Sequence, residues 1–162
     1  MSLNSQQNGF TLIEAMVVIV LIGVVAAIAL PSFKSVIDGR RLAGAAEHLF
    51  ANLNYARSEA IKQNQNVQFQ FDTNKWCYGI DDTGADCDCS GAPNDCQVSG
   101  QTKVYDDSDY PGVVLSVSGI AGDAITFEPR QGLTDNAATF IFSLGQRQRS
   151  VSVNAVGRIK MD

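Results

Sequence analysis

One carboxylate stands at the head of a long apolar segment. Glu14 is followed by residues 15–30, which include no charged side chain. An ionised acid is costly inside a membrane unless a cation pairs with it. We therefore expect Glu14 to have a cationic partner, and the candidate is a new amino terminus that cleavage after Gly9 would create.

The four cysteines of the chain lie close together in the sequence. In an oxidising compartment an even number of cysteines favours disulfides. A direct bond between Cys87 and Cys89 would be strained, so each is expected to pair outward, with Cys77 and Cys96 in either order. A zinc site of four thiolates fits the Cys-x-Cys spacing and the compartment less well.

Aspartates outnumber lysines between Asp72 and Asp109. Carboxylates in this stretch could supply the hard oxygen ligands that calcium prefers. Their spacing matches no calcium loop, so a solvated acidic loop is the favoured interpretation and no metal is predicted. The four candidate ligands are Asp81, Asp82, Asp86 and Asp88.

Basic residues gather near the end of the chain, at Arg147, Arg149, Arg158 and Lys160. Residues two apart on a strand point to the same face. If the two segments pair as a hairpin, four cations could line one patch and bind the phosphates of double-stranded DNA in a salt-sensitive manner. The alternative is ordinary solvated charge on an edge strand, where it discourages aggregation.

No constellation of catalytic residues is visible. His48 is the single histidine, and it falls on a predicted helix, where a surface or packing role is favoured. The chain carries no Ser-His-Asp set, phosphate loop or metal triad that sequence patterns identify. We therefore predict a protein that is not an enzyme and needs no cofactor.

The apolar segment sets the architecture. Residues 10–30, as a helix, would span roughly 30 Å, enough to cross a bilayer core. A secretory signal peptide would need a basic start, and a domain this small could hardly bury such a helix. A plain membrane anchor without assembly into a filament remains an alternative. The net charge of −5 argues against a general nucleic-acid binder.

The helix is predicted to continue as an amphipathic segment over residues 31–66, with a bend near Pro31, Gly39 and Gly44. Apolar residues recur there at steps of three and four, which predicts one buried stripe. The stripe consists of Leu42, Ala46, Leu49, Leu53, Ala56 and Ala60.

Strands are predicted after the helix, separated by turn residues. A single long helix followed by antiparallel strands indicates an α+β fold. Residues 81–102 read as a loop rich in Gly, Asp, Ser and Cys. The predicted strands are 67–71, 75–80, 113–117, 124–127, 139–143, 150–153 and 157–161.

The sequence GFTLIE at residues 9–14, ahead of the apolar helix, resembles the prepilin signature of type IV pilins and of the pseudopilins of type II secretion. The resemblance implies cleavage between Gly9 and Phe10 by a prepilin peptidase, and N-methylation of Phe10. It also implies that Glu14 pairs with the Phe10 amine of a neighbouring subunit in a helical filament.

A second resemblance covers the junction at residues 53–64 and the ending Gly157-Arg158. Both look like the GspH/FimT family of minor pilins and pseudopilins. FimT-type minor pilins carry a C-terminal Gly-Arg-x-Arg motif implicated in binding incoming DNA. This chain has GRIK at residues 157–160, which keeps the charge but loses one planar guanidinium.

These observations predict a minor pilin of a type IV pilus that helps assembly and binds DNA for natural transformation. The alternative is a GspH-like minor pseudopilin of type II secretion with a purely structural role. The expected organisation is a leader at 1–9, a transmembrane helix at 10–30, its continuation at 31–66 and a β-rich domain at 67–162 with a disulfide-rich loop at 77–102. The expected partners are other pilins or pseudopilins.

The predicted location is the inner membrane, crossed once, with the C-terminal domain in the periplasm and later in a pilus or pseudopilus. Lys34, Arg40 and Arg41 would then lie outside the cytoplasm. That placement runs against the positive-inside rule.

Overall fold

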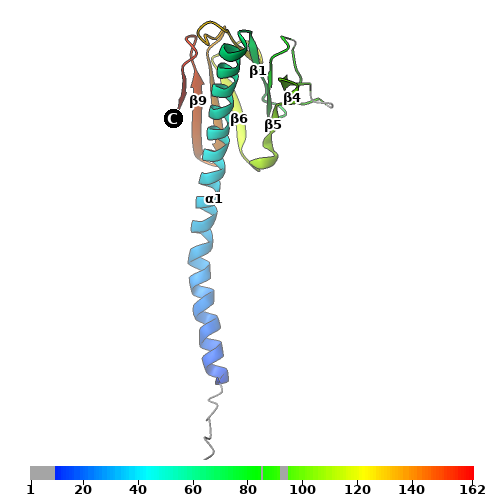
Figure 1. The fold of residues 1–162 in the computed structure, drawn as a ribbon. Helices are drawn as coiled ribbons and strands as arrows, with labels where there is room; N and C mark the ends of the chain where they lie inside the picture. The colour runs from blue at the N-terminus through cyan, green and yellow to red at the C-terminus, as the bar shows by residue number, and fades with distance from the viewer. Residues whose placement is uncertain (1–9, 85, 92–94) are drawn as a thin grey trace, which may run out of the picture. The chain divides into compact units, whose positions relative to one another are not determined.

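The computed structural model describes residues 10–84, 86–91 and 95–162 of the 162-residue chain, with the side chains of 29–32 left aside. The chain divides into an N-terminal unit, Met1–Ile37, and a second unit, Asp38–Asp162, called here the β-rich unit. One helix, α1 (Leu12–Gln63), extends through both (Figure 1). Its backbone stays helical at Pro31, Gly39 and Gly44, so none of these residues interrupts it.

The strands of the β-rich unit form two antiparallel four-stranded sheets and a short hairpin (Figure 1). The first sheet has the order β5 (Val104–Asp106), β2 (Cys77–Asp81), β1 (Val67–Asp72), β7 (Ala124–Phe127). The second has the order β10 (Ile159–Met161), β9 (Arg147–Val153), β8 (Ala138–Leu144), β6 (Val114–Ser118). The hairpin pairs β3 (Gln97–Val98) with β4 (Gln101–Thr102), and a 3-10 turn, η1 (Asp107–Asp109), follows β5.

The predicted apolar stripe of α1 is confirmed as the spine of the core. All six of its residues are buried, in one cluster with side chains from both four-stranded sheets. The strands contribute alternate residues to this core, as β1 shows with Val67, Phe69 and Phe71 buried. Each fully buried large apolar side chain stabilises such a core by about 1.5–3 kcal/mol.

The α+β arrangement is confirmed, and the structure adds three strands that the sequence analysis missed. β3 and β4 lie inside the stretch predicted to be a loop, and β5 follows it. These strands have two or three residues each, too short for an alternating pattern to be recognised. The longer strands divide between two four-stranded sheets, a division that the sequence analysis did not address.

Candidate functional site

The N-terminal end of α1 is capped by its own residues. The Glu14 backbone N–H donates to Thr11 Oγ1 at 3.3 Å, and the Thr11 N–H donates to Glu14 Oε2 at 3.5 Å. This reciprocal pair is a capping box, which satisfies two backbone donors that a helix start leaves open. The Thr-x-x-Glu spacing is the sequence signature of a capping box. The sequence analysis nevertheless assigned Glu14 only a partner outside its own subunit.

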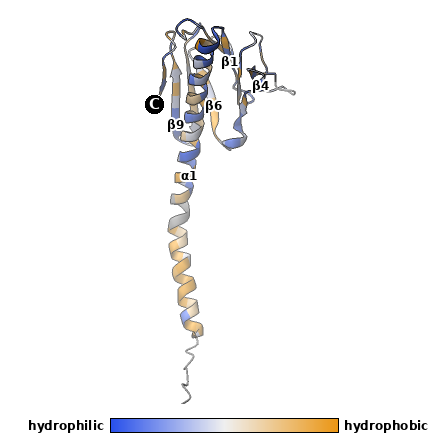
Figure 2. Ribbon diagram, viewed as in Figure 1, coloured by the Kyte–Doolittle hydropathy of each residue, from blue (hydrophilic) through white to orange (hydrophobic). Residues whose placement is uncertain are grey.

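The segment that follows Glu14 exposes its apolar side chains. Figure 2 shows this part of α1 as almost uniformly hydrophobic, and Phe10 at its start is 84% exposed. By length and composition α1 could cross a membrane. An apolar surface of this extent marks contact with lipid or with partner helices. Of the predicted cleavage site, Phe10 is described, whereas Gly9 lies outside the described residues.

The C-terminal cations lie on the predicted hairpin of β9 and β10, but in two pairs. Lys160 lies opposite Ser152, whereas Arg147 and Arg149 lie on β9 beyond the last residue of β10. Directly opposed residues of antiparallel strands point to the same face, and successive residues alternate. Arg147 and Arg149 therefore share the face of the buried Val151, and Lys160 projects from the other face.

Arg158 belongs with Lys160. It lies at the turn before β10, where its N–H donates to Asn154 Oδ1 at 2.8 Å, and its side chain is exposed like that of Lys160. The two residues are two positions apart and share a face. The structure thus brings Arg158 and Lys160 together but separates them from Arg147 and Arg149, so the predicted patch of four cations does not form.

Gly157 holds the turn between β9 and β10 against a neighbouring loop. Its φ is +70°, and a Cβ there would lie 1.7 Å from the carbonyl oxygen of Gly132 and 3.3 Å from Arg57 Nε. Arg57 Nη2 in turn donates to the Gln131 carbonyl at 3.2 Å. The glycine of the Gly-Arg pair is therefore a packing requirement. The sequence analysis missed Gly132 and Arg57, because nothing local to them reports a contact so distant in the chain.

The cysteines form two disulfides, Cys77–Cys89 and Cys87–Cys96, which is one of the two orders the sequence left open. All four are buried and form a small cluster of their own. The bridges pack on β2 at Gly79, where a Cβ would lie 2.3 Å from Cys96 Sγ. They therefore supply a core to a stretch with few apolar residues, and they require a glycine beneath them.

Removal of one disulfide, by Cys87→Ser with Cys96→Ser, is expected to lower the free energy of unfolding by about 2–4 kcal/mol, as closed loops of this size predict. The matching pair Cys77→Ser with Cys89→Ser should lose a similar amount, because the sequence separations are 9 and 12. Urea unfolding followed by the fluorescence of the buried Trp76 measures both. A loss of less than about 0.5 kcal/mol for each pair would show that the bridges do not hold this loop.

Two of the candidate calcium ligands are engaged inside the loop. Asp81 is buried, and its two carboxylate oxygens accept from the N–H groups of Thr83 at 2.8 Å and Gln97 at 3.0 Å. Asp82 Oδ2 accepts from the Ser99 N–H at 2.7 Å. These carboxylates join the β3–β4 hairpin to the end of β2, which is a structural role for them.

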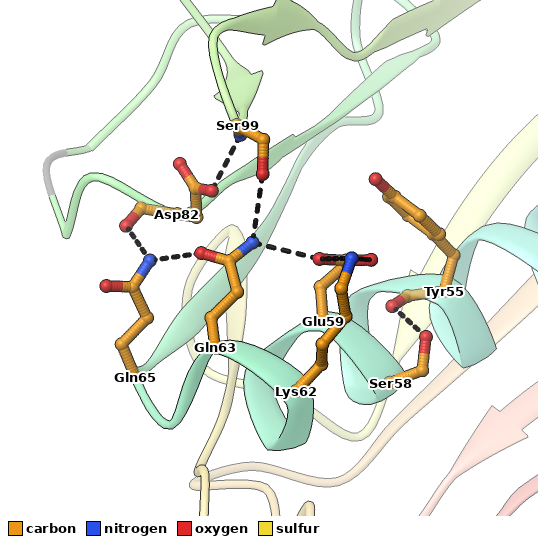
Figure 3. A network of polar contacts seen from close by, with 8 residues as sticks. All are labelled: Tyr55, Ser58, Glu59, Lys62, Gln63, Gln65, Asp82 and Ser99. Carbon is orange, nitrogen blue, oxygen red and sulfur yellow. Dashed lines mark hydrogen bonds and ion pairs between the residues drawn. The ribbon is translucent and has the colours of Figure 1, made fainter.

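A polar network fixes the C-terminal end of α1 to the same hairpin (Figure 3). Glu59 accepts from Gln63 Nε2 at 2.9 Å and from Lys62 Nζ at 3.0 Å, and the Gln63 amide also donates to Ser99 Oγ at 3.3 Å. The hydrogen bonds from Gln63 and Lys62 lower the pKa of Glu59 below its usual value. The carboxylate therefore stays ionised at neutral pH and continues to accept both donors.

His48 lies among tyrosines. Its ring packs edge-on against Tyr105 with centroids 4.8 Å apart, and its Nδ1 is 3.4 Å from the hydroxyl of Tyr78. That hydroxyl also accepts from Asn52 Nδ2 at 3.4 Å. Burial raises the pKa of Tyr78. These contacts give His48 a packing role between α1 and the first sheet.

The family described as "Type II transport protein GspH" matches residues 45–157, and the "Prokaryotic N-terminal methylation motif" matches residues 4–30. The solved type IV minor pilin FimU of Pseudomonas aeruginosa is similar in fold, with 22% identity, a TM-score of 0.56 and coverage of 76% of this chain and 89% of that one.

The minor pseudopilin EpsH of the Vibrio cholerae Type 2 Secretion System is also similar, with 16% identity, a TM-score of 0.58 and coverage of 75% of this chain and 95% of that one. No curated protein sequence matches the chain. At these identities the two structures establish a shared fold over about three quarters of this chain.

Proposed function

The chain belongs to the GspH family of type II transport proteins, and we propose that this minor pilin or pseudopilin acts as a minor pilin of a type IV pilus and helps to assemble it. The observation that carries the proposal is the exposed apolar half of α1 with Glu14 at its head. Such a surface buries itself first in lipid and then against the helices of other subunits. Members of this class are structural components, and no catalytic activity is proposed.

Processing and placement follow from the same segment. We propose that prepilin peptidase cuts between Gly9 and Phe10, that Phe10 is methylated, and that Glu14 pairs with the Phe10 amine of a neighbouring subunit. The methylation motif that matches residues 4–30 supports this. Before assembly, the helix crosses the inner membrane and the β-rich unit lies in the periplasm.

The second candidate is a minor pseudopilin of a type II secretion system. The likeness to EpsH supports this second candidate about as well as the likeness to FimU supports the first, because the two TM-scores, 0.58 and 0.56, are close. Deletion of the gene distinguishes the two candidates when piliation, transformation and secretion of exoproteins are scored together. Loss of piliation with normal secretion supports the pilus, and the reverse supports the secretion system.

Binding of double-stranded DNA is proposed for a smaller patch than the sequence analysis predicted. Arg158 and Lys160 share one exposed face of β10, whereas Arg147 and Arg149 lie on the other face of β9. Each cation that meets a phosphate releases a counterion, so two contacts give a weak affinity with a logarithmic salt slope of about −2.

A gel shift of the full chain in a neutral detergent, at low and moderate salt, tests this patch. The double change Arg158→Ala with Lys160→Ala is expected to weaken binding to DNA of any sequence. It should also reduce the slope of log affinity against log salt concentration by about 2. Arg147→Ala with Arg149→Ala removes the same charge from the other face and should leave the affinity nearly unchanged. The DNA role would be contradicted if the wild type does not bind DNA at low salt. It would also be contradicted if the double variant of Arg158 and Lys160 binds as tightly as the wild type.

A further inference from the structure

The turn before β10 is joined to the loop between β7 and β8. The Thr134 hydroxyl of this loop donates to the Asn154 carbonyl of the turn at 2.8 Å. A Cβ on Gly157 would lie 1.7 Å from the Gly132 carbonyl oxygen, so the two segments touch through their backbones. Residues near Gly132 therefore lie close to Arg158, which follows Gly157 in the turn and belongs to the proposed DNA patch.

The same loop carries an arginine that the proposed patch does not include. Arg130 is exposed and comes two residues before Gly132. The Gly132 N–H donates to the Glu128 carbonyl at 3.0 Å, which closes the loop around Arg130. Arg57 Nη2 donates to the Gln131 carbonyl at 3.2 Å, which fixes the loop to α1. The backbone of Arg130 is therefore held in place beside the turn. Its guanidinium group is a planar donor that matches the oxygens of a phosphate in pairs.

Among the residues that the structure describes, no carboxylate pairs with the cations of the loop and the turn. The ion pair that forms there joins Lys62 to Glu59. Arg130, Arg158 and Lys160 are all exposed and keep their charge open to a ligand. Cations that packing brings together repel each other until an anion binds between them. A ligand with closely spaced negative charges, such as the phosphates of a nucleic acid, suits this arrangement.

Arg130 also lines a shallow cavity of about 370 Å³ beside the end of α1. The other residues of this cavity are Asn64, Asn66, Glu128 and Pro129. Both asparagines are exposed, and amide side chains commonly donate to the phosphates and sugars of a nucleic acid. Glu128 is the acid among these residues, and its charge opposes the approach of a phosphate. The cavity thus offers one cation and two amides to a nucleic-acid backbone, against one carboxylate.

We propose that Arg130 contacts a phosphate of the double-stranded DNA that Arg158 and Lys160 bind. Three Cα–Cα steps of about 3.8 Å and the touching glycines separate Arg130 from Arg158, so their Cα atoms lie within roughly 17 Å of each other. About five nucleotides of one strand, at ~3.4 Å each, cover that span. Resting on the DNA binding proposed above, a third phosphate contact changes the logarithmic salt slope from about −2 to about −3.

The test is a gel shift of the full chain in a neutral detergent with double-stranded DNA, between about 50 and 200 mM salt. Arg130→Gln is expected to weaken binding roughly tenfold at the lower salt and to reduce the salt slope by about 1. Glu128→Gln removes the opposing charge from the same cavity and should strengthen binding several-fold. The controls Arg149→Gln and Glu47→Gln make the same two charge changes at other exposed sites of the β-rich unit and should leave the affinity unchanged.

Failure of this contact is distinguishable from failure of the DNA role. If the wild type does not bind DNA at the lower salt, the DNA role fails, and the contact of Arg130 fails with it. If the double variant of Arg158 and Lys160 weakens binding but Arg130→Gln binds like the wild type, the contact of Arg130 alone is overturned. An equal loss in Arg149→Gln would also overturn it, because total charge would then decide the affinity. Circular dichroism verifies the fold of each variant. If Arg130→Gln unfolds, Glu128→Gln decides, since unfolding cannot produce a gain in affinity.

Discussion

Glu14→Gln is expected to leave the helix intact and to reduce incorporation into the filament by roughly a hundredfold to several thousandfold, because breaking a buried charge pair costs about 3–5 kcal/mol. Glutamine is accepted at the third helical position of a capping box, so the hydrogen bonds with Thr11 persist. The variant therefore removes the charge and keeps the cap. The proposed ammonium group of Phe10 in a neighbouring subunit is then left without an anion.

Immunoblots of sheared filaments from cells that produce only the variant measure this incorporation. Thr11→Ala breaks the capping box and keeps the charge, so it should cost about 1 kcal/mol of helix stability and leave incorporation near normal. Glu47→Gln makes the same charge change at an exposed site of the β-rich unit and serves as the matched control. If Glu14→Gln is incorporated normally, or Thr11→Ala fails as badly, Glu14 acts only as a helix cap.

Gly157→Ala is expected to lower the free energy of unfolding by about 2–5 kcal/mol, the sum of a left-handed backbone and forced repacking. The added Cβ would lie 1.7 Å from the Gly132 carbonyl oxygen, so the turn and the loop of Gly132 must move apart. Arg57 lies at the same junction and would lose its close contact with both glycines. Urea unfolding in a mild detergent, followed by circular dichroism, measures the loss.

Gly145→Ala is the matched control for Gly157. Its φ is +62°, similar to +70° at Gly157, but no heavy atom lies within 4 Å of the position of a Cβ. It should therefore show the backbone effect alone, about 1–2 kcal/mol. Equal losses of unfolding free energy in the two variants would mean that the loop of Gly132 moves aside without strain. The claim that packing against Gly132 requires a glycine at position 157 would then be wrong.

The sequence by itself determined the features that arise from local patterns. A run of apolar residues with one acid at its head needs no distant information, because length and polarity alone decide where such a helix is stable. The buried stripe of α1 and the alternation of β1 were predictable for the same reason, since the period of apolar residues matches the period of the element. The prepilin-like signature at residues 9–14 is likewise contiguous.

Only the tertiary structure decided the relations between distant segments. The register that sets Lys160 opposite Ser152 places Arg147 and Arg149 on the other face, and a shift of one residue would have united all four cations. The close contact of Gly157 with the Gly132 carbonyl depends on how separate segments approach each other, and so does the pairing of the cysteines. Such contacts are set by packing across the whole core, so no local pattern of residues reports them.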